Sequence, residues 1–172
     1  MKILALDLGT KTGVAFGGIG AAPIPIVETH RWATAKEITS YRKLRMDRRR
    51  DPRLIRFFNY LQAVRAERPD VVVFEDVQFS SSTMQTQLWA SFRTAVWLAF
   101  EPPTIIECVP TGTLKKFAGS GSFDKVAMSK ALRWQYPGYW NPLLDDNAID
   151  AIWIWLWAKK TFGRGVDSSP RV

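Results

Sequence analysis

Two short apolar runs, each ending in a carboxylate, constrain the fold of this chain more than any other feature. The run from residue 3 to 8 is interrupted only by Asp7. The run from residue 71 to 74 repeats the pattern and is followed by Glu75. Such runs are typical of strands that are buried on both faces of a sheet. Burying an unpaired carboxylate costs on the order of several kcal/mol, so each acid needs a cation, a hydrogen-bond network or the surface.

The remaining pattern predicts an α/β fold. Gly9 and Gly13 allow a sharp turn after Asp7, and three sequential strands joined by glycine-rich turns predict an antiparallel meander. Beyond the first strand, we expect strands at 14–16, 24–32, 71–74 and 104–109. We expect helices at 52–67, 85–100, 123–135 and 144–163, with a short helix or turn within 110–121. The expected architecture is a five-stranded mixed sheet, in which the meander continues into parallel strands, flanked by helices.

The length of 172 residues suits one domain, which we place at residues 1–163, with a disordered tail at 164–172. A single cysteine excludes an internal disulfide, and the only histidine, His30, leaves little material for a Cys/His zinc site or a catalytic triad. No signal-peptide pattern follows Lys2, and the apolar run at 148–158 is too short to span a bilayer. We therefore expect a soluble, intracellular (cytoplasmic) protein.

The charge balance points to a polyanionic partner. Lysine and arginine total 24 against 16 acids, which gives a net charge of +8 and a pI near 9.9. Residues 42–53 hold seven basic side chains and two acids. This stretch is either a solvated helix entry or an arm that contacts phosphates, and its density of cations favours DNA contact through Arg48, Arg49 and Arg50. The alternative is a basic protein that has no such partner.

Four acids stand out as candidate metal ligands: Asp7, Glu75, Asp146 and Asp150. The last two are four residues apart and therefore share a helix face, although acids in a first turn also simply complement the helix dipole. Carboxylates brought together repel one another unless cations neutralise them, and oxygen ligands suit Mg²⁺ or Mn²⁺. Two such ions can activate a water and stabilise the leaving oxygen in phosphodiester hydrolysis.

The motifs also resemble a known family. Asp-Leu-Gly-Thr-Lys-Thr-Gly (residues 7–13) resembles the opening of the RNase H-like superfamily, which includes RuvC-like nucleases and the actin-like ATPases and sugar kinases. The strand ending in Glu75, and Asp-Asp-Asn-Ala-Ile-Asp-Ala (residues 145–151) opening the last helix, resemble the RuvC-like Holliday-junction resolvases, including bacteriophage-type members. The resemblance runs from Lys2 to about Ala158. It implies an RNase H-like fold and a structure-specific endodeoxyribonuclease that cleaves four-way junctions and related branched DNA.

The resemblance also implies particular site residues. Asp7, Glu75 and Asp150 match the family's metal-binding acids. Family members often place the fourth acid three residues before the last one, where this chain has Asn147. Asp146 is our choice for the fourth ligand, with Asn147 or Asp145 as a replacement.

Three further positions match residues that the family uses around DNA. Lys125 matches a lysine near the scissile phosphate, and either Lys115 or Lys116 matches another. A lysine there would stabilise charge that develops on the phosphoryl group, although a solvated cation at a helix end is the plainer interpretation. Phe79 matches an aromatic side chain that stacks on an unpaired junction base, and a core phenylalanine is the alternative.

Other functions remain open at this point. An actin-like ATPase would need a second domain and a second phosphate-binding Asp-Gly turn, which the sequence lacks. A YqgF-type RNA-processing nuclease would share fold and metal site, and a non-catalytic junction binder would tolerate loss of the acids. The approximate two-fold symmetry of a junction favours a homodimer. The helix at 85–100, with Trp89 and Trp97, is either the dimer surface or a core helix, and we expect neither a membrane partner nor a nucleotide cofactor.

Overall fold

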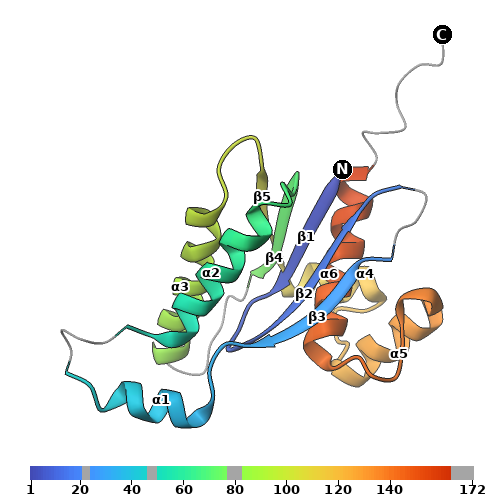
Figure 1. Ribbon diagram of the computed structural model, residues 1–172. Helices are drawn as coiled ribbons and strands as arrows, with labels where there is room; N and C mark the ends of the chain where they lie inside the picture. The colour runs from blue at the N-terminus through green and yellow to red at the C-terminus, as the bar shows by residue number, and fades with distance from the viewer. Residues whose placement is uncertain (21–23, 46–49, 77–82, 164–172) are drawn as a thin grey trace.

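The computed structural model describes residues 1–20, 24–45, 50–76 and 83–163, which build one five-stranded sheet with helices on both faces (Figure 1). The strand order is β3-β2-β1-β4-β5. The first three strands pair antiparallel, and β1–β4 and β4–β5 pair parallel. The predicted mixed sheet, a meander continued by parallel strands, is confirmed. The strands are β1 (Lys2–Asp7), β2 (Lys11–Gly18), β3 (Ile26–Arg31), β4 (Val71–Asp76) and β5 (Ile105–Pro110).

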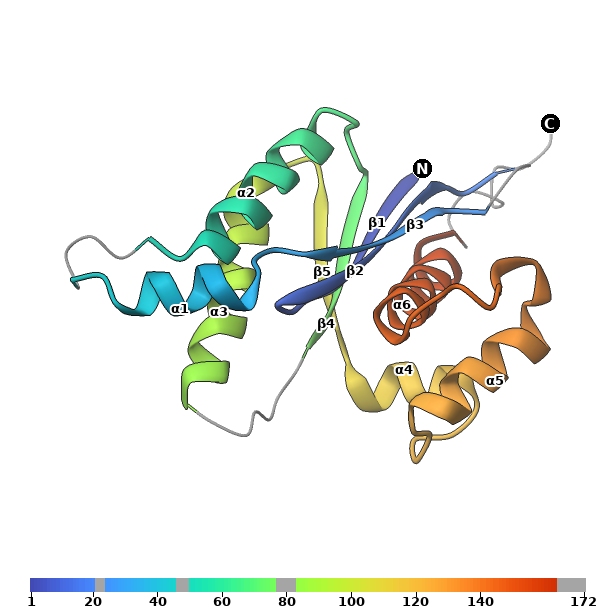
Figure 2. The ribbon, with the colours of Figure 1, turned by 60° about the horizontal axis from the view of Figure 1, so that its bottom comes forward.

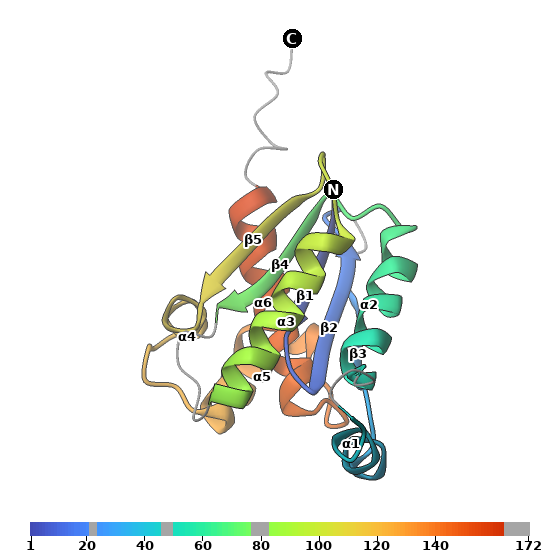
Figure 3. The ribbon, with the colours of Figure 1, turned by 90° about the vertical axis from the view of Figure 1, so that its left-hand side faces the viewer.

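The helices form two layers that enclose the sheet. Figure 2 shows α2 and α3 on one face and α4, α5 and α6 on the other. Figure 3 looks onto the first of these faces, with α3 lying in front of the strands. We call the two sides the α3 face and the α6 face. The helices are α1 (Ala35–Arg42), α2 (Pro52–Arg65), α3 (Thr83–Ala99), α4 (Thr111–Ala118), α5 (Lys125–Gln135), α6 (Asp146–Gly163) and the short 3₁₀ helix η2 (Pro137–Tyr139).

Strand alternation divides the apolar side chains between two cores. In β4, Val71 and Val73 pack into the core on the α6 face, whereas Val72 and Phe74 pack into the core on the α3 face. This is the two-residue period of a strand that is covered on both sides. The next residue in the alternation, Glu75, therefore belongs to the α6 face.

Helix α6 forms the centre of its layer. The run from Ile152 to Trp157 alternates aliphatic and aromatic residues as a strand would, yet it is helical as predicted, and every residue from 151 to 156 is buried. A helix that is apolar all round is buried all round. The indoles of Trp153 and Trp155 donate to the carbonyls of Met128 and Gly17, so their polar atoms are satisfied.

Some elements differ from the sequence-based predictions. Helix α1 was not predicted, although Thr34 and Glu37 form a capping box, a sequence signature of a helix start. Strand β2 is longer than predicted because it pairs along its length with both neighbours. The predicted tail at 164–172 lies outside the described residues. Within the part of the chain described here, no helix is long and apolar enough to cross a membrane.

Candidate active site

Acidic side chains from three separate elements meet at one edge of the sheet. Asp7 ends β1, and Glu75 lies one residue before the end of β4. These strands are parallel neighbours, so their C-terminal ends share an edge. Asp150 comes from the second turn of α6, which packs against β1 and β2. Two strand ends and one helix thus deliver the three carboxylates that were predicted to act together.

The pKa shifts of Asp7 and Asp150 show that the carboxylates of the site repel one another. Burial raises the pKa of Asp7 well above its usual range, and the charges of Asp150 and Glu75 raise it further. Burial also raises the pKa of Asp150 to about 6, and here Glu75 is the strongest like charge. Opposing these effects, the Lys125 ammonium lowers the pKa of both acids. The site is a set of mutually repelling, partly desolvated acids whose repulsion Lys125 partly offsets.

A cavity of about 330 Å³ opens beside these acids on the α6 face. Glu75 and Asp150 line it together with Lys115 of α4 and Lys125 of α5. Lys115 lowers the pKa of Asp150, which places its charge within reach of the carboxylate. The cavity therefore brings acids and cations from four elements together, and apolar side chains such as Trp153 complete its lining.

Of the two adjacent lysines matched to one family position, the structure brings Lys115 into the cavity. Lys116 is exposed and its side chain lies near Gly121 in the following loop. Arg50 is exposed ahead of the first turn of α2 and does not line the cavity. The remaining predicted DNA contacts, Phe79, Arg48 and Arg49, lie outside the described residues.

Two of the three candidates for the fourth ligand, Asp146 and Asp145, have different surroundings. Asp146 is exposed, lies 3.5 Å from Lys125 Nζ, and its charge raises the pKa of Asp150. Asp145 accepts hydrogen bonds from the Ala148 amide and from Thr29, at 2.9 and 2.8 Å. It is the N-cap of α6 in position and contacts. Asp146 is therefore the acid directed toward the site, whereas Asp145 stabilises the start of α6.

Asp145 fastens the start of α6 to the sheet. Its second oxygen lies 2.7 Å from Lys11 Nζ on β2, and Thr29 belongs to β3. Burial would raise the pKa of Asp145, but its hydrogen bonds, led by that from Lys11, outweigh this effect and lower the pKa to about 2. The carboxylate thus stays charged and anchors the helix turn that carries Asp146.

Gly13 allows α6 to approach the strand beside Asp7. It is the register partner of Asp7 in the β1–β2 pair. A Cβ at Gly13 would lie 1.9 Å from the carbonyl oxygen and 2.4 Å from the carbonyl carbon of Asn147. No side chain fits there, because the first turn of α6 lies directly against the strand. This contact sets how closely Asp150 approaches the strand ends.

The donor chemistry of the site fits a hard divalent cation. Asp7, Glu75 and Asp150 offer only carboxylate oxygens, the ligands that Mg²⁺ and Mn²⁺ prefer. Burial, and after it the repulsion between carboxylates that a cation would relieve, raises the pKa values of Asp7 and Asp150. Within residues 1–20, 24–45, 50–76 and 83–163, no three carboxylate, thiol or imidazole groups converge closely enough to hold an ion as they stand. The carboxylates would have to turn inward to bind one.

Sequence reasoning missed several residues that shape the site. Asp124 lines the cavity, but its carboxylate accepts from the Ala127 amide at 2.8 Å and caps α5, which places Lys125 in the first helical position. The signal for this role was an aspartate directly before a helical pattern. Thr111 also lines the cavity at the start of α4, and no sequence pattern singled it out.

Comparison with known proteins gives structural matches only. No protein-family model and no curated protein matches the chain. The chain is similar to T. thermophilus RuvC in complex with a Holliday junction substrate (TM-score 0.74, 19% identity, 96% of each chain). It is similar to a second Thermus thermophilus RuvC structure (0.68, 19%, 95% of this chain and 97% of that one). The yeast mitochondrial Holliday junction resolvase Ydc2 also matches (0.53, 15%, 88% and 75%). The predicted RNase H-like fold of the RuvC type is confirmed.

Proposed function

We propose that this protein is a structure-specific endonuclease that cleaves four-way DNA junctions and related branched DNA. The observation that carries the proposal is the meeting of Asp7, Glu75 and Asp150 at one sheet edge beside Lys125. Two further facts support it: the net charge of +8, and a fold that follows RuvC over 96% of the chain. The similar solved structures named above are RuvC and a Holliday junction resolvase, and they do not favour an RNA-processing nuclease, an ATPase or a non-catalytic binder.

Three of the acids would bind the metal ions directly, and the fourth would flank them. Asp7, Glu75 and Asp150 would hold the ions, two per site, and Asp146 would complete the set from the solvent side. Bound Mg²⁺ or Mn²⁺ would supply the charge that activates a water and stabilises the leaving oxygen of the scissile phosphodiester. Because metal ligands must be ionised, the raised pKa values of Asp7 and Asp150 mean that metal binding should strengthen as the pH rises.

The lysines of the cavity would act on the phosphate. Lys125 and Lys115 line the same cavity as Glu75 and Asp150, so a phosphate bound in it would lie within reach of both lysines. Their fixed charges would stabilise negative charge that grows on the phosphoryl oxygens during attack. The ion pair of Lys125 with exposed Asp146 would open as the phosphate enters, because the two compete for one ammonium.

The substrate panel that tests the proposal contains labelled four-way junction, flap, fork and linear duplex DNA. Each is incubated with Mg²⁺, with Mn²⁺ and with chelator, using wild type and Asp7→Asn. We expect cleavage of the junction that needs a divalent ion and is lost in Asp7→Asn, while junction binding survives. Equal cutting of all branched forms would indicate a broader debranching nuclease. Binding without cleavage of any DNA would contradict the proposal, and structured RNA would then be the next substrate.

We also propose that the protein acts as a homodimer inside the cell, where branched DNA arises. A junction needs two symmetric cuts, and a two-fold dimer supplies two sites in the required relation. Helix α3 exposes Trp97 by 47% and Leu98 by 67%, and neighbouring α2 exposes Ile55 by 44%. Of these side chains, Ile55 and Leu98 line an apolar groove between the two helices. Leu98→Glu should shift the sedimentation of a wild-type dimer to that of a monomer, whereas Val126→Glu, at an exposed position of α5, should not.

A further inference from the structure

Helix α1 contributes nothing to the hydrophobic core. None of its residues, 35–42, is buried. Figures 1 and 3 both show it projecting beyond the sheet and beneath the ends of α2 and α3. Eight residues are too few for a helix to be stable in water by itself. Contacts with the rest of the protein must therefore hold α1 in place.

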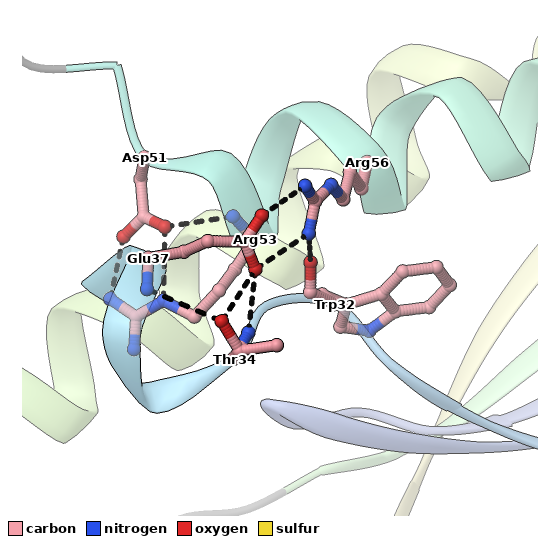
Figure 4. A network of polar contacts seen from close by, with 6 residues as sticks. All are labelled: Trp32, Thr34, Glu37, Asp51, Arg53 and Arg56. Atoms are coloured by element: carbon pink, nitrogen blue, oxygen red, sulfur yellow. Dashed lines mark hydrogen bonds and ion pairs between the residues drawn. The ribbon is translucent and has the colours of Figure 1, made fainter. Parts of the chain in front are cut away.

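A polar clamp at the start of α1 provides these contacts (Figure 4). Glu37 accepts from the Thr34 amide at 2.8 Å, and the Thr34 hydroxyl accepts from the Glu37 amide at 3.3 Å. The Arg56 guanidinium from α2 then holds both oxygens of Glu37, donating to one at 3.1 Å. The hydrogen bond from Arg56 is the leading cause that lowers the pKa of Glu37 to about 2. The clamp is therefore charged at every pH at which the protein would work.

The same clamp fixes α1 at the edge of the sheet where the candidate active site lies. Arg56 also donates to the carbonyl of Trp32, at 2.9 Å. The Trp32 indole donates to buried Thr12 at 2.7 Å, and the Thr12 hydroxyl donates to the Gly9 carbonyl at 2.8 Å. Gly9 belongs to the turn that directly follows Asp7. A short series of hydrogen bonds thus joins the base of α1 to that turn.

The clamp also determines which charges α1 presents to solvent. The half-buried residues of α1, 37, 38 and 41, share the face toward the body of the protein. Lys36 and Lys43 are exposed and seven residues apart, so they lie on the outer face about 10 Å apart along the axis. They form no ion pair with any described residue. The acids at either side, Glu37 and Asp51, are already paired with arginines of α2.

We propose that α1 is a docking arm for the phosphate backbone of the duplex DNA that leaves the cleavage site. Lys36 and Lys43 on its outer face would each neutralise one phosphate. The Glu37–Arg56 clamp would hold both lysines at the edge of the sheet where the candidate active site lies. This inference rests on the proposed nuclease function and adds a contact outside the catalytic cavity. Charge complementarity identifies the DNA backbone as the partner. Two lysines on a polar helix can neutralise phosphates, but they do not form the contacts to base edges that recognise a sequence.

Salt dependence of binding measures the contact directly. The wild type and Lys36→Gln/Lys43→Gln are titrated with a long-armed four-way junction, in chelator, over a range of salt concentrations. Each lost phosphate contact lowers the slope of log K against log salt by about 0.9, so the variant should lose about 2 units of slope. On a junction with arms too short to reach α1, wild type and variant should bind alike.

A matched control removes the same charge at the opposite edge of the sheet. Arg65 and Arg68 lie at the C-terminal end of α2, beside the N-terminal end of β4. Arg68 has a positive φ of 51°, so asparagine, which tolerates that conformation, replaces it. Arg65→Gln/Arg68→Asn should keep the wild-type slope, although its net charge equals that of the lysine variant.

A third variant separates the placement of the arm from its charge. Glu37→Ala removes the clamp and raises the net charge by one. If only charge mattered, this variant would bind more tightly and more steeply in salt. Because the clamp places the lysines, we expect weaker binding and a slope that falls toward that of Lys36→Gln/Lys43→Gln. Hydroxyl-radical footprinting should show the same lost protection on the flanking duplex in both variants.

The outcomes separate this inference from the proposed function. A wild type that binds no junction would overturn both. A wild type that binds and cleaves, with an unchanged slope in Lys36→Gln/Lys43→Gln, would overturn the docking arm alone. An equal loss of slope in the lysine variant and in the arginine control would also overturn it, because the effect would then be one of net charge.

Discussion

Gly13 offers a sharp test of how α6 is placed. Adding one methyl group at this position puts a Cβ 1.9 Å from the Asn147 carbonyl oxygen, where real contacts are no shorter than 3.0 Å. The first turn of α6 or the strand must therefore move by about 1.1 Å. Overpacking of this kind costs about 1–3 kcal/mol. For a chain of this length we expect the melting temperature to fall by roughly 2–12 °C.

The same displacement should affect cleavage more than stability. Gly13 pairs in register with Asp7, and the turn that moves carries Asp146 and leads to Asp150. A misplacement of about 1 Å in an active site can lower the rate by about 100-fold. We therefore expect Gly13→Ala to remain folded by circular dichroism and to lose about two orders of magnitude in junction cleavage under single-turnover conditions.

Gly18 on the same strand supplies the matched control. A Cβ there would meet only the Met1 carbonyl oxygen, at 3.8 Å, which is ordinary van der Waals contact. Gly18→Ala should melt within about 1 kcal/mol of wild type, with a small gain from the stiffer unfolded chain, and should cleave normally. If Gly13→Ala melted and cleaved like Gly18→Ala, the close approach of α6 to β2 would be refuted, and with it our account of how Asp150 is positioned.

Three further predictions concern charge and hydrogen bonding. Because the folded protein raises the pKa of Asp150 from 3.8 to about 6, it holds more protons than the unfolded chain in that window, so metal-free stability should fall as pH rises through it. Asp150→Asn should remove this loss and be more stable than wild type at pH 7 without metal, by up to about 3 kcal/mol in urea titrations; a less stable variant would contradict the repulsion. Lys125→Ala should slow cleavage and move the acidic limb of its pH profile upward, because the lysine lowers the pKa of both buried acids; Lys130→Ala, on the same helix, should leave the profile unchanged. Thr12→Val should cost about 1–3 kcal/mol in thermal melts, because it leaves the buried Trp32 indole N–H without an acceptor, and an unchanged melting temperature would contradict that bond.

Much of the fold could be predicted because its signals are local. The run of apolar residues before Asp7 and the similar run before Glu75 specify buried strands without reference to anything distant. Helix α2 was predicted from Pro52 and from apolar residues at helical spacing, and the structure buries Phe57 and Leu61 on that face. Helix α1 was missed because it has no apolar stripe. Its position depends on Arg56, nineteen residues along the chain from Glu37.

The sequence was enough to predict which acids form the candidate site, but it did not show the separate role of each. Strand ends and helix spacing were enough to group Asp7, Glu75 and Asp150. The difference between Asp145 and Asp146 was not visible, because it depends on Lys11 and Thr29, which lie more than a hundred residues away. Likewise, Lys115 lines the cavity and Lys116 does not. The orientation of α4 in the fold decides this, and the sequence spacing of the two lysines does not reveal it.

The requirement for Gly13 illustrates the same limit. In the sequence it is one of two glycines around a turn, and a flexible turn is sufficient reason for it. The structure gives a different reason, since the residue lies within β2 and its lack of a side chain admits the α6 backbone. Contacts between backbones that are distant in sequence leave no periodic pattern.

The most direct test of the central claim maps the cuts themselves. A four-way junction is labelled on each strand in turn, and the products of a single turnover in Mg²⁺ or Mn²⁺ are resolved to the nucleotide. The account predicts paired nicks placed symmetrically about the branch point on two opposing strands, with none in chelator or with Asp7→Asn. Unpaired cuts scattered along the arms, or cuts that persist with Asp7→Asn, would contradict a junction-resolving site built on these acids.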